Sequence, residues 1–90
     1  MPQAIVDPDE LRRFAQNLKK FNVELQDRMA AINGQLVALG TTWRDQENKK
    51  FVTEFEQQIR AIARFIELTS QHIPYLLRKA EMIEEYLRER

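Results

Sequence analysis

Hydrophobic side chains recur along the first part of the chain at the spacing of one helical face. Successive members of this stripe are separated by three or four positions, which is the repeat of an amphipathic α-helix. The stripe contains Leu11, Phe14, Leu18, Phe21, Leu25, Met29, Ile32, Leu36 and Leu39. Asp7 can accept hydrogen bonds from free backbone N–H groups, and Pro8 suits a first helical turn. The pattern predicts a helix over residues 8–39 that stops at Gly40, which suits the C′ position.

A second stripe with the same spacing runs through the other half of the chain. It contains Phe51, Phe55, Ile59, Ile62, Ile66, Thr69, Ile73, Leu76, Ala80, Ile83 and Leu87. It predicts a second helix over about residues 46–88. Pro74 lies inside this helix and cannot donate to the carbonyl of Ser70, so we expect a kink near Pro74. Because the register of the stripe is unbroken across the proline, a bent helix is favoured over two separate helices.

The strongest break in the middle of the chain lies at residues 40–45 and predicts a turn between the helices. Thr42 and Asp45 have the spacing of a capping box, and Asp45 alone could instead cap the second helix. The predicted fold is therefore all-α. Two long antiparallel helices form a hairpin within a single domain that covers residues 1–90.

A hairpin with these helix lengths leaves much apolar surface uncovered. The helices would extend roughly 48 and 65 Å at 1.5 Å per residue. Packed only on each other they would fall short of the roughly 60% surface burial of a compact domain of this size. Helix two carries an additional stripe, and helix one carries a smaller flank. The stripe is Phe65, Leu68, His72, Tyr75, Lys79, Met82 and Tyr86, and the flank is Val23, Ala30 and Val37.

These extra apolar positions predict self-association into an antiparallel four-helix bundle. The alternative is that they merely widen the contact between the two helices of one hairpin. The candidate partner-binding residues are Phe65, Leu68, Tyr75, Met82 and Tyr86.

Charge and composition narrow the classes of partner. Fourteen Lys and Arg balance fourteen Asp and Glu, so the net charge is zero. A nucleic-acid binder needs a basic surface, and an interfacial lipid-binding helix usually has one too, so neither class is expected. No apolar stretch approaches the roughly 18 residues of a membrane span. The N-terminal sequence also lacks the pattern of a Sec signal peptide.

The residues offer no catalytic constellation. Cysteine is absent, which excludes thiolate chemistry and disulfides. His72 is the sole histidine, and no carboxylate lies one helical turn away to orient it or to share a metal ion. The chain has no glycine-rich phosphate loop, nucleophile elbow or His-Glu-x-x-His motif. We therefore expect a protein that is not an enzyme and uses neither a metal nor a cofactor.

Trp43 lies at the bend between the two helices, with Phe51 eight residues later. This layout resembles the WXG family of early-secreted-antigen-like proteins, which are substrates and partners of type VII secretion systems. The family signature is a Trp-x-Gly turn between two long antiparallel helices, and the resemblance covers essentially the whole chain. It implies a secreted binding module that pairs with itself or with a related hairpin. Trp43 is then either a partner contact site or a structural residue that closes the bend over the last turn of helix one. It also allows a secretion ATPase as a partner.

The sequence departs from the family pattern at two places. The turn motif is Trp43-Arg44-Asp45, with an aspartate where the family has glycine. The family's C-terminal export signal is Tyr-x-x-x-Asp/Glu, whereas Tyr86 is followed by Glu89 at three residues, which makes a weak tail signal. The location therefore remains open between secretion without a Sec signal peptide and the cytoplasm. The alternative function is an intracellular helical adaptor or structural protein that is not exported.

Overall fold

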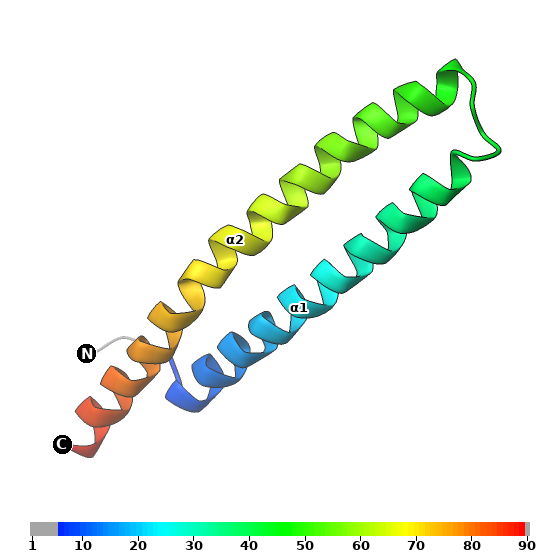
Figure 1. Ribbon diagram of the computed structural model, residues 1–90. Helices are drawn as coiled ribbons and strands as arrows, with labels where there is room; N and C mark the ends of the chain where they lie inside the picture. The colour runs from blue at the N-terminus through cyan, green and yellow to red at the C-terminus, as the bar shows by residue number, and fades with distance from the viewer. Residues whose placement is uncertain (1–5, 90) are drawn as a thin grey trace.

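The computed structural model describes residues 6–89 as two long helices joined by a short turn. Helix α1 spans Pro8–Leu39 and helix α2 spans Gln46–Arg88. The two helices run antiparallel and side by side, with the turn at one end of the molecule (Figure 1). Neither a strand nor a further helix occurs between residues 6 and 89. The predicted all-α hairpin is confirmed.

Aspartate side chains cap the N-termini of both helices. Asp7 accepts a hydrogen bond from the backbone N–H of Asp9 at 2.8 Å, and Asp45 accepts one from the N–H of Asn48 at 3.0 Å. The hydroxyl of Thr42 instead donates to the carbonyl of Leu39 at 3.3 Å. Asp45 alone therefore caps α2, and the capping-box alternative with Thr42 does not apply.

The end of α1 is built from right-handed backbone. Gly40 has φ −64° and ψ −13°, so it does not take the left-handed conformation that favours glycine at C′. The N–H of Gly40 reaches the carbonyls of both Leu36 and Val37, and the N–H of Trp43 donates to Leu39 at 2.9 Å. The helix thus tightens in its last turn before the chain reverses.

The two helices meet along a narrow strip, which we call the seam. Its fully or nearly fully buried residues, within the part of the chain that the structure describes, are Ala15, Asn22, Ile73 and Ala80. Most of the predicted α2 stripe lies half-buried or buried along this seam, whereas Phe51 and Leu87 at its two ends are exposed.

Helix α1 is rotated relative to the sequence-based prediction. Phe14 and Phe21, which the stripe placed in the seam, are 56% and 49% exposed. Their places are taken by Ala15, which is fully buried, and by Asn22, which is 4% exposed. The prediction for Phe14 and Phe21 was wrong because it followed apolar character alone. A small residue and a hydrogen-bonded amide occupy the seam instead.

The hairpin is far from globular. Its principal extents are 68 × 20 × 16 Å and its radius of gyration is 20.2 Å, against roughly 12 Å for a compact domain of 90 residues. Its accessible surface is 7403 Å², about 1,900 Å² more than the roughly 5,500 Å² expected for a compact monomer of 10.7 kDa. Two packed helices therefore leave a large surplus of surface.

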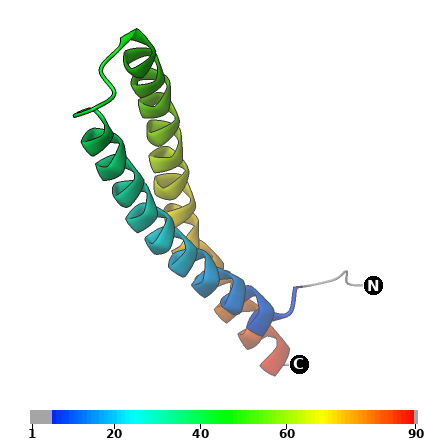
Figure 2. The same ribbon diagram turned by 90° about the vertical axis from the view of Figure 1, so that its right-hand side faces the viewer.

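Helix α2 continues through Pro74 without interruption. Figure 2 shows α2 changing direction along its length, so that the end of the hairpin with the two termini is bent relative to the end with the turn. Near this open end, Arg12 of α1 bridges Asp9 on its own helix and Glu84 on α2, each at 2.9 Å. The bridge links the beginning of α1 to the last turns of α2.

Candidate association face

Three aromatic side chains stack at the turn end of the hairpin. The ring centroid of Trp43 lies 6.0 Å from that of Phe51, and the Phe51 centroid lies 5.7 Å from that of Phe55. Trp43 is half-buried, so one part of its indole packs on Phe51 while the rest meets solvent. This arrangement joins the turn to the first two turns of α2. It also leaves an aromatic surface at the end of the molecule.

The other two residues of the turn motif make local contacts. The guanidinium Nε of Arg44 donates to the carbonyl of Thr41 at 3.1 Å, and Asp45 caps α2. Both residues are exposed. The Trp43-Arg44-Asp45 turn is therefore held by bonds within the loop and by the Trp43–Phe51 contact.

One side of the hairpin carries a long row of exposed apolar residues. Phe21 of α1 and Phe65 of α2 meet edge to face, with ring centroids 6.4 Å apart and planes at 87°. This contact places the outer stripe of α1 and the outer stripe of α2 on the same side. We call this side the Phe face and define it by Phe14, Phe21, Phe65, Leu68, Tyr75, Met82 and Tyr86. Each of these side chains is exposed in the single chain.

All five predicted partner-binding residues lie on the Phe face, but the predicted flank of α1 does not. Phe14 and Phe21 supply the α1 side of the face. Val23 instead lines a groove on the opposite side of the hairpin. Phe14 and Phe21 were not among the predicted partner-binding residues, because their apolar spacing places them in the seam. The feature that accounts for their outward position is Asn22, whose amide donates hydrogen bonds to the hydroxyls of Thr69 and Ser70 on α2.

Two shallow apolar grooves extend the Phe face toward the turn. One, of about 240 Å³, includes Arg28 and Ile32 in its wall. These residues lie seven and eleven positions after Phe21, so the groove opens on the same side as that ring. The other groove, of about 200 Å³, runs from Ile32 past Leu39 to Phe51. The apolar surface is thus nearly continuous along the hairpin.

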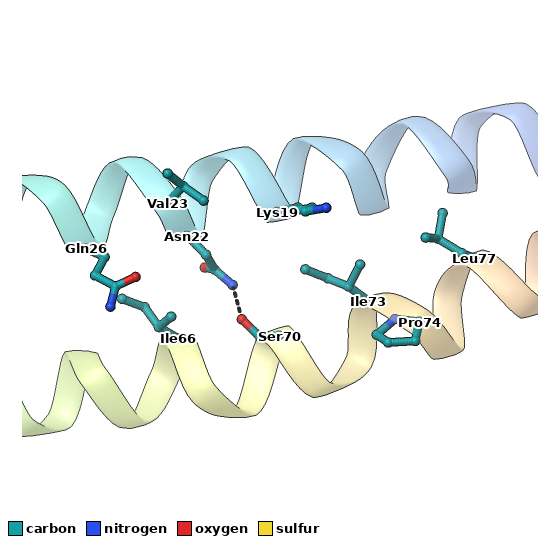
Figure 3. A pocket seen from close by; sticks show the side chains of 9 residues that line it. All are labelled: Lys19, Asn22, Val23, Gln26, Ile66, Ser70, Ile73, Pro74 and Leu77. Carbon is teal, nitrogen blue, oxygen red and sulfur yellow. Dashed lines mark hydrogen bonds between the residues drawn. The ribbon is translucent and has the colours of Figure 1, made fainter.

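A further groove, of about 460 Å³, lies on the opposite side, near the middle of the hairpin (Figure 3). Its walls include Val23 from α1 and Pro74 and Leu77 from α2, and Lys19 and Gln26 also line it. At its base the Asn22 amide nitrogen Nδ2 donates to Thr69 Oγ1 at 2.9 Å and to Ser70 Oγ at 3.2 Å. The Asn22 oxygen Oδ1 is buried with no partner. A buried unpaired acceptor costs about 1–3 kcal/mol.

The two residues of the weak tail signal lie at the C-terminal end of α2. Tyr86 is exposed, and Glu89 follows as the C-cap residue, its N–H donating to the carbonyl of Glu85 at 3.1 Å. The side chains are separated by three positions on helical backbone, close to one turn. Both are accessible to a partner.

The described residues hold no group of three His, Asp or Glu side chains arranged to bind a metal ion. Among residues 6–89, neither helix is long and apolar enough to cross a membrane.

Comparison with solved structures finds the same hairpin in a bacterial secreted protein. A single-substitution variant of the secreted protein EsxB from Bacillus anthracis str. Sterne superposes with a TM-score of 0.75 at 27% identity, covering 93% of this chain and 97% of that one. Selenomethionine-labelled EsxB gives the same score and identity, over 96% and 98% of the two chains. Wild-type EsxB gives a TM-score of 0.74 at 28% identity, over 91% and 94%.

No curated protein matches the sequence significantly. The family model WXG100, described as proteins of 100 residues with WXG, matches residues 3–86. That match covers nearly the whole chain, including the Trp43 turn, all of α1 and most of α2. The protein therefore belongs to the WXG100 family.

Proposed function

We propose that this protein is a non-catalytic binding module of a type VII secretion system, and that it acts by pairing its Phe face with a second helical hairpin. The observation that carries the proposal is the row of exposed aromatic and aliphatic side chains on one side of the hairpin. Apolar patches of this extent on a soluble chain mark sites of protein association. The described residues hold no group of side chains that would support a metal-binding role.

The surface area supports a second copy as the partner. A stable interface buries about 800 Å² on each side, and obligate homodimers bury more. The hairpin exposes about 1,900 Å² beyond the surface of a compact monomer of its mass, so it can supply such an interface without losing contacts of its own. The net charge of zero removes long-range repulsion between two identical chains.

The position of the aromatic contact also suits pairing of identical hairpins. Phe21 lies near the middle of α1, and its partner Phe65 lies near the middle of α2. In a two-fold dimer the same patch is used on both chains. Two hairpins placed antiparallel with full overlap bring the Phe21–Phe65 pairs of both copies to the centre of the interface. Aromatic residues at the centre of an interface contribute most of its binding energy.

Secretion is supported by the family and by EsxB, which is described as a secreted protein. An exported chain of this family would leave the cell through the secretion ATPase, and Tyr86 and Glu89 are exposed residues at the C-terminal end of α2 that such a partner could contact. The test is export from a bacterium that carries a type VII system, with and without its secretion ATPase. We expect the wild-type chain in the medium only when the ATPase is intact.

The controls for this test come from the same helix. The Tyr86→Ala/Glu89→Ala double variant should be retained in the cell, whereas Glu81→Ala, another exposed acidic position of α2, should be exported normally. A wild-type chain that stays inside both hosts would contradict export and favour the alternative of an intracellular helical adaptor. The imperfect Tyr86–Glu89 spacing is the feature that favours that alternative.

A further inference from the structure

We infer that Asn22 sets the rotation of α1 about its own axis and thereby directs Phe14 and Phe21 outward onto the Phe face. The starting point is an ambiguity in the sequence of α1. The seam can be built from Leu11, Leu18 and Leu25 with either of two sets of intervening residues. One set contains Phe14 and Phe21, and the other contains Ala15 and Asn22. By apolar character alone the first set is the better core.

The two choices differ by a small rotation. At 3.6 residues per turn, exchanging Phe14 and Phe21 for Ala15 and Asn22 turns α1 by roughly 40°. The structure adopts the second choice, with Ala15 fully buried and Asn22 4% exposed. The leucines stay at least partly inside in either case. The rotation therefore changes the exposure of the two phenylalanines much more than the exposure of the leucines.

Hydrogen bonding to α2 distinguishes the two rotations. Both hydrogens of the Asn22 amide have acceptors in the observed state, Thr69 Oγ1 at 2.9 Å and Ser70 Oγ at 3.2 Å. Thr69 also donates its own hydroxyl hydrogen to the carbonyl of Phe65 at 2.7 Å, which holds its oxygen toward α1 as an acceptor. The amide and the hydroxyl of Ser70 lie between the helices in Figure 3. No other asparagine, threonine or serine of the described chain makes a side-chain bond between α1 and α2.

A single polar residue in an apolar helix contact is a known means of choosing one packing arrangement at a cost in stability. The cost is visible here, because Asn22 Oδ1 is buried without a partner. In return, this rotation leaves Phe14 and Phe21 exposed, so that Phe21 contacts Phe65 on the outer side. This second step rests on the proposed association through the Phe face, whereas the rotation itself does not.

The test removes the two acceptors and reads the rotation directly. The chain has no cysteine, so single cysteines at positions 14 and 15 report which position is buried through their rates of reaction with a thiol reagent. In the otherwise unchanged protein, F14C should react at least about tenfold faster than A15C, because residue 15 is buried in a stable helix pair. In the Thr69→Val/Ser70→Ala background we expect this ratio to fall and reverse, since a buried Asn22 would then lack every acceptor.

Two controls separate rotation from general damage. Adding Asn22→Leu to the double variant removes the buried amide altogether, and the ratio should stay reversed, because apolar character alone favours Phe14 and Phe21 in the seam. Thr53→Val removes a hydroxyl that bonds only the carbonyl of Lys49 on α2, so it should leave the ratio unchanged. The NMR cross-peak between the rings of Phe21 and Phe65, measured without any cysteine, should disappear in both the double and the triple variant and persist in Thr53→Val.

An unchanged reactivity ratio in the folded double variant would overturn the inference. So would a double variant that loses its helical circular dichroism instead of rotating while the triple variant folds. Mass in solution is a separate readout for the second step. A reversed ratio with the mass of the wild type would support the rotation and contradict a role of Phe14 and Phe21 in association.

Discussion

At the scale of single residues, the turn shows how the protein forms a family-type bend with an aspartate in place of the family glycine. No described residue of the turn has positive φ, so the backbone does not require glycine anywhere between the helices. Asp45 instead contributes a side-chain oxygen that accepts from the N–H of Asn48 at 3.0 Å. Trp43 packs on Phe51 beside it. The substitution therefore keeps the turn and adds a helix cap.

Replacing Asp45 tests this account of the turn. Asp45→Ala removes the acceptor and should lower the free energy of unfolding by about 1 kcal/mol, whereas Asp45→Gly should cost only a few tenths of a kcal/mol. Urea denaturation at fixed protein concentration measures both. Thr42→Ala is the matched control, because the Thr42 hydroxyl caps nothing on α2, and it should stay within about 0.5 kcal/mol of wild type. Equal losses for the Ala and Gly variants would contradict the capping role.

Also at the scale of single residues, the sequence alone could not decide which residues of α1 face α2. The spacing of apolar residues predicts both helices and the outward stripe on α2, because these depend on periodicity alone. It fails at Phe14 and Phe21, since the choice between them and Ala15 and Asn22 depends on a bond to another helix. Hydrophobic periodicity contains no information about whether a buried amide finds two hydroxyls 47 and 48 positions away.

At the scale of elements, α2 combines an unbroken register with a proline in its interior. Pro74 leaves the carbonyl of Ser70 without its helical donor, and the hydroxyl of Ser70 is one of the two acceptors for Asn22. The groove of about 460 Å³ is lined by Asn22, Ser70 and Pro74, so the proline and the polar contact lie in the same part of the hairpin. This part of α2 lacks one regular helical hydrogen bond but makes a defined polar contact with α1.

Restoring the missing donor should stabilise α2. Pro74→Ala supplies an N–H for Ser70 and removes the ring from the preceding turn, so the free energy of unfolding should rise by about 1–3 kcal/mol. Urea denaturation at one protein concentration measures the gain, and hydrogen exchange at residue 74 should show protection. Glu81→Ala, at an exposed position of the same helix outside the association stripe, should change stability by less than about 0.5 kcal/mol. A loss of stability in Pro74→Ala would mean that the bend is required for packing on α1.

At the scale of the whole molecule, the hairpin has more surface than its seam can hide. Within residues 6–89 no large side chain is fully buried, and the core consists of small or partly buried groups. Most large apolar residues remain at least partly open to solvent, and most of the exposed ones lie on the Phe face and near the turn. A chain built this way gains stability by associating with a partner, so its folding and its binding are linked by mass action.

The mass of the protein in solution tests the central claim most directly. Light scattering at micromolar concentration should give about twice 10.7 kDa for the wild type. Phe21→Glu would bury a charge in the interface and should return the mass to that of one chain. Val23→Glu, on the same helix with similar exposure but on the opposite side, should remain dimeric. A wild-type mass of 10.7 kDa across this range, or equal behaviour of the two variants, would contradict association through the Phe face.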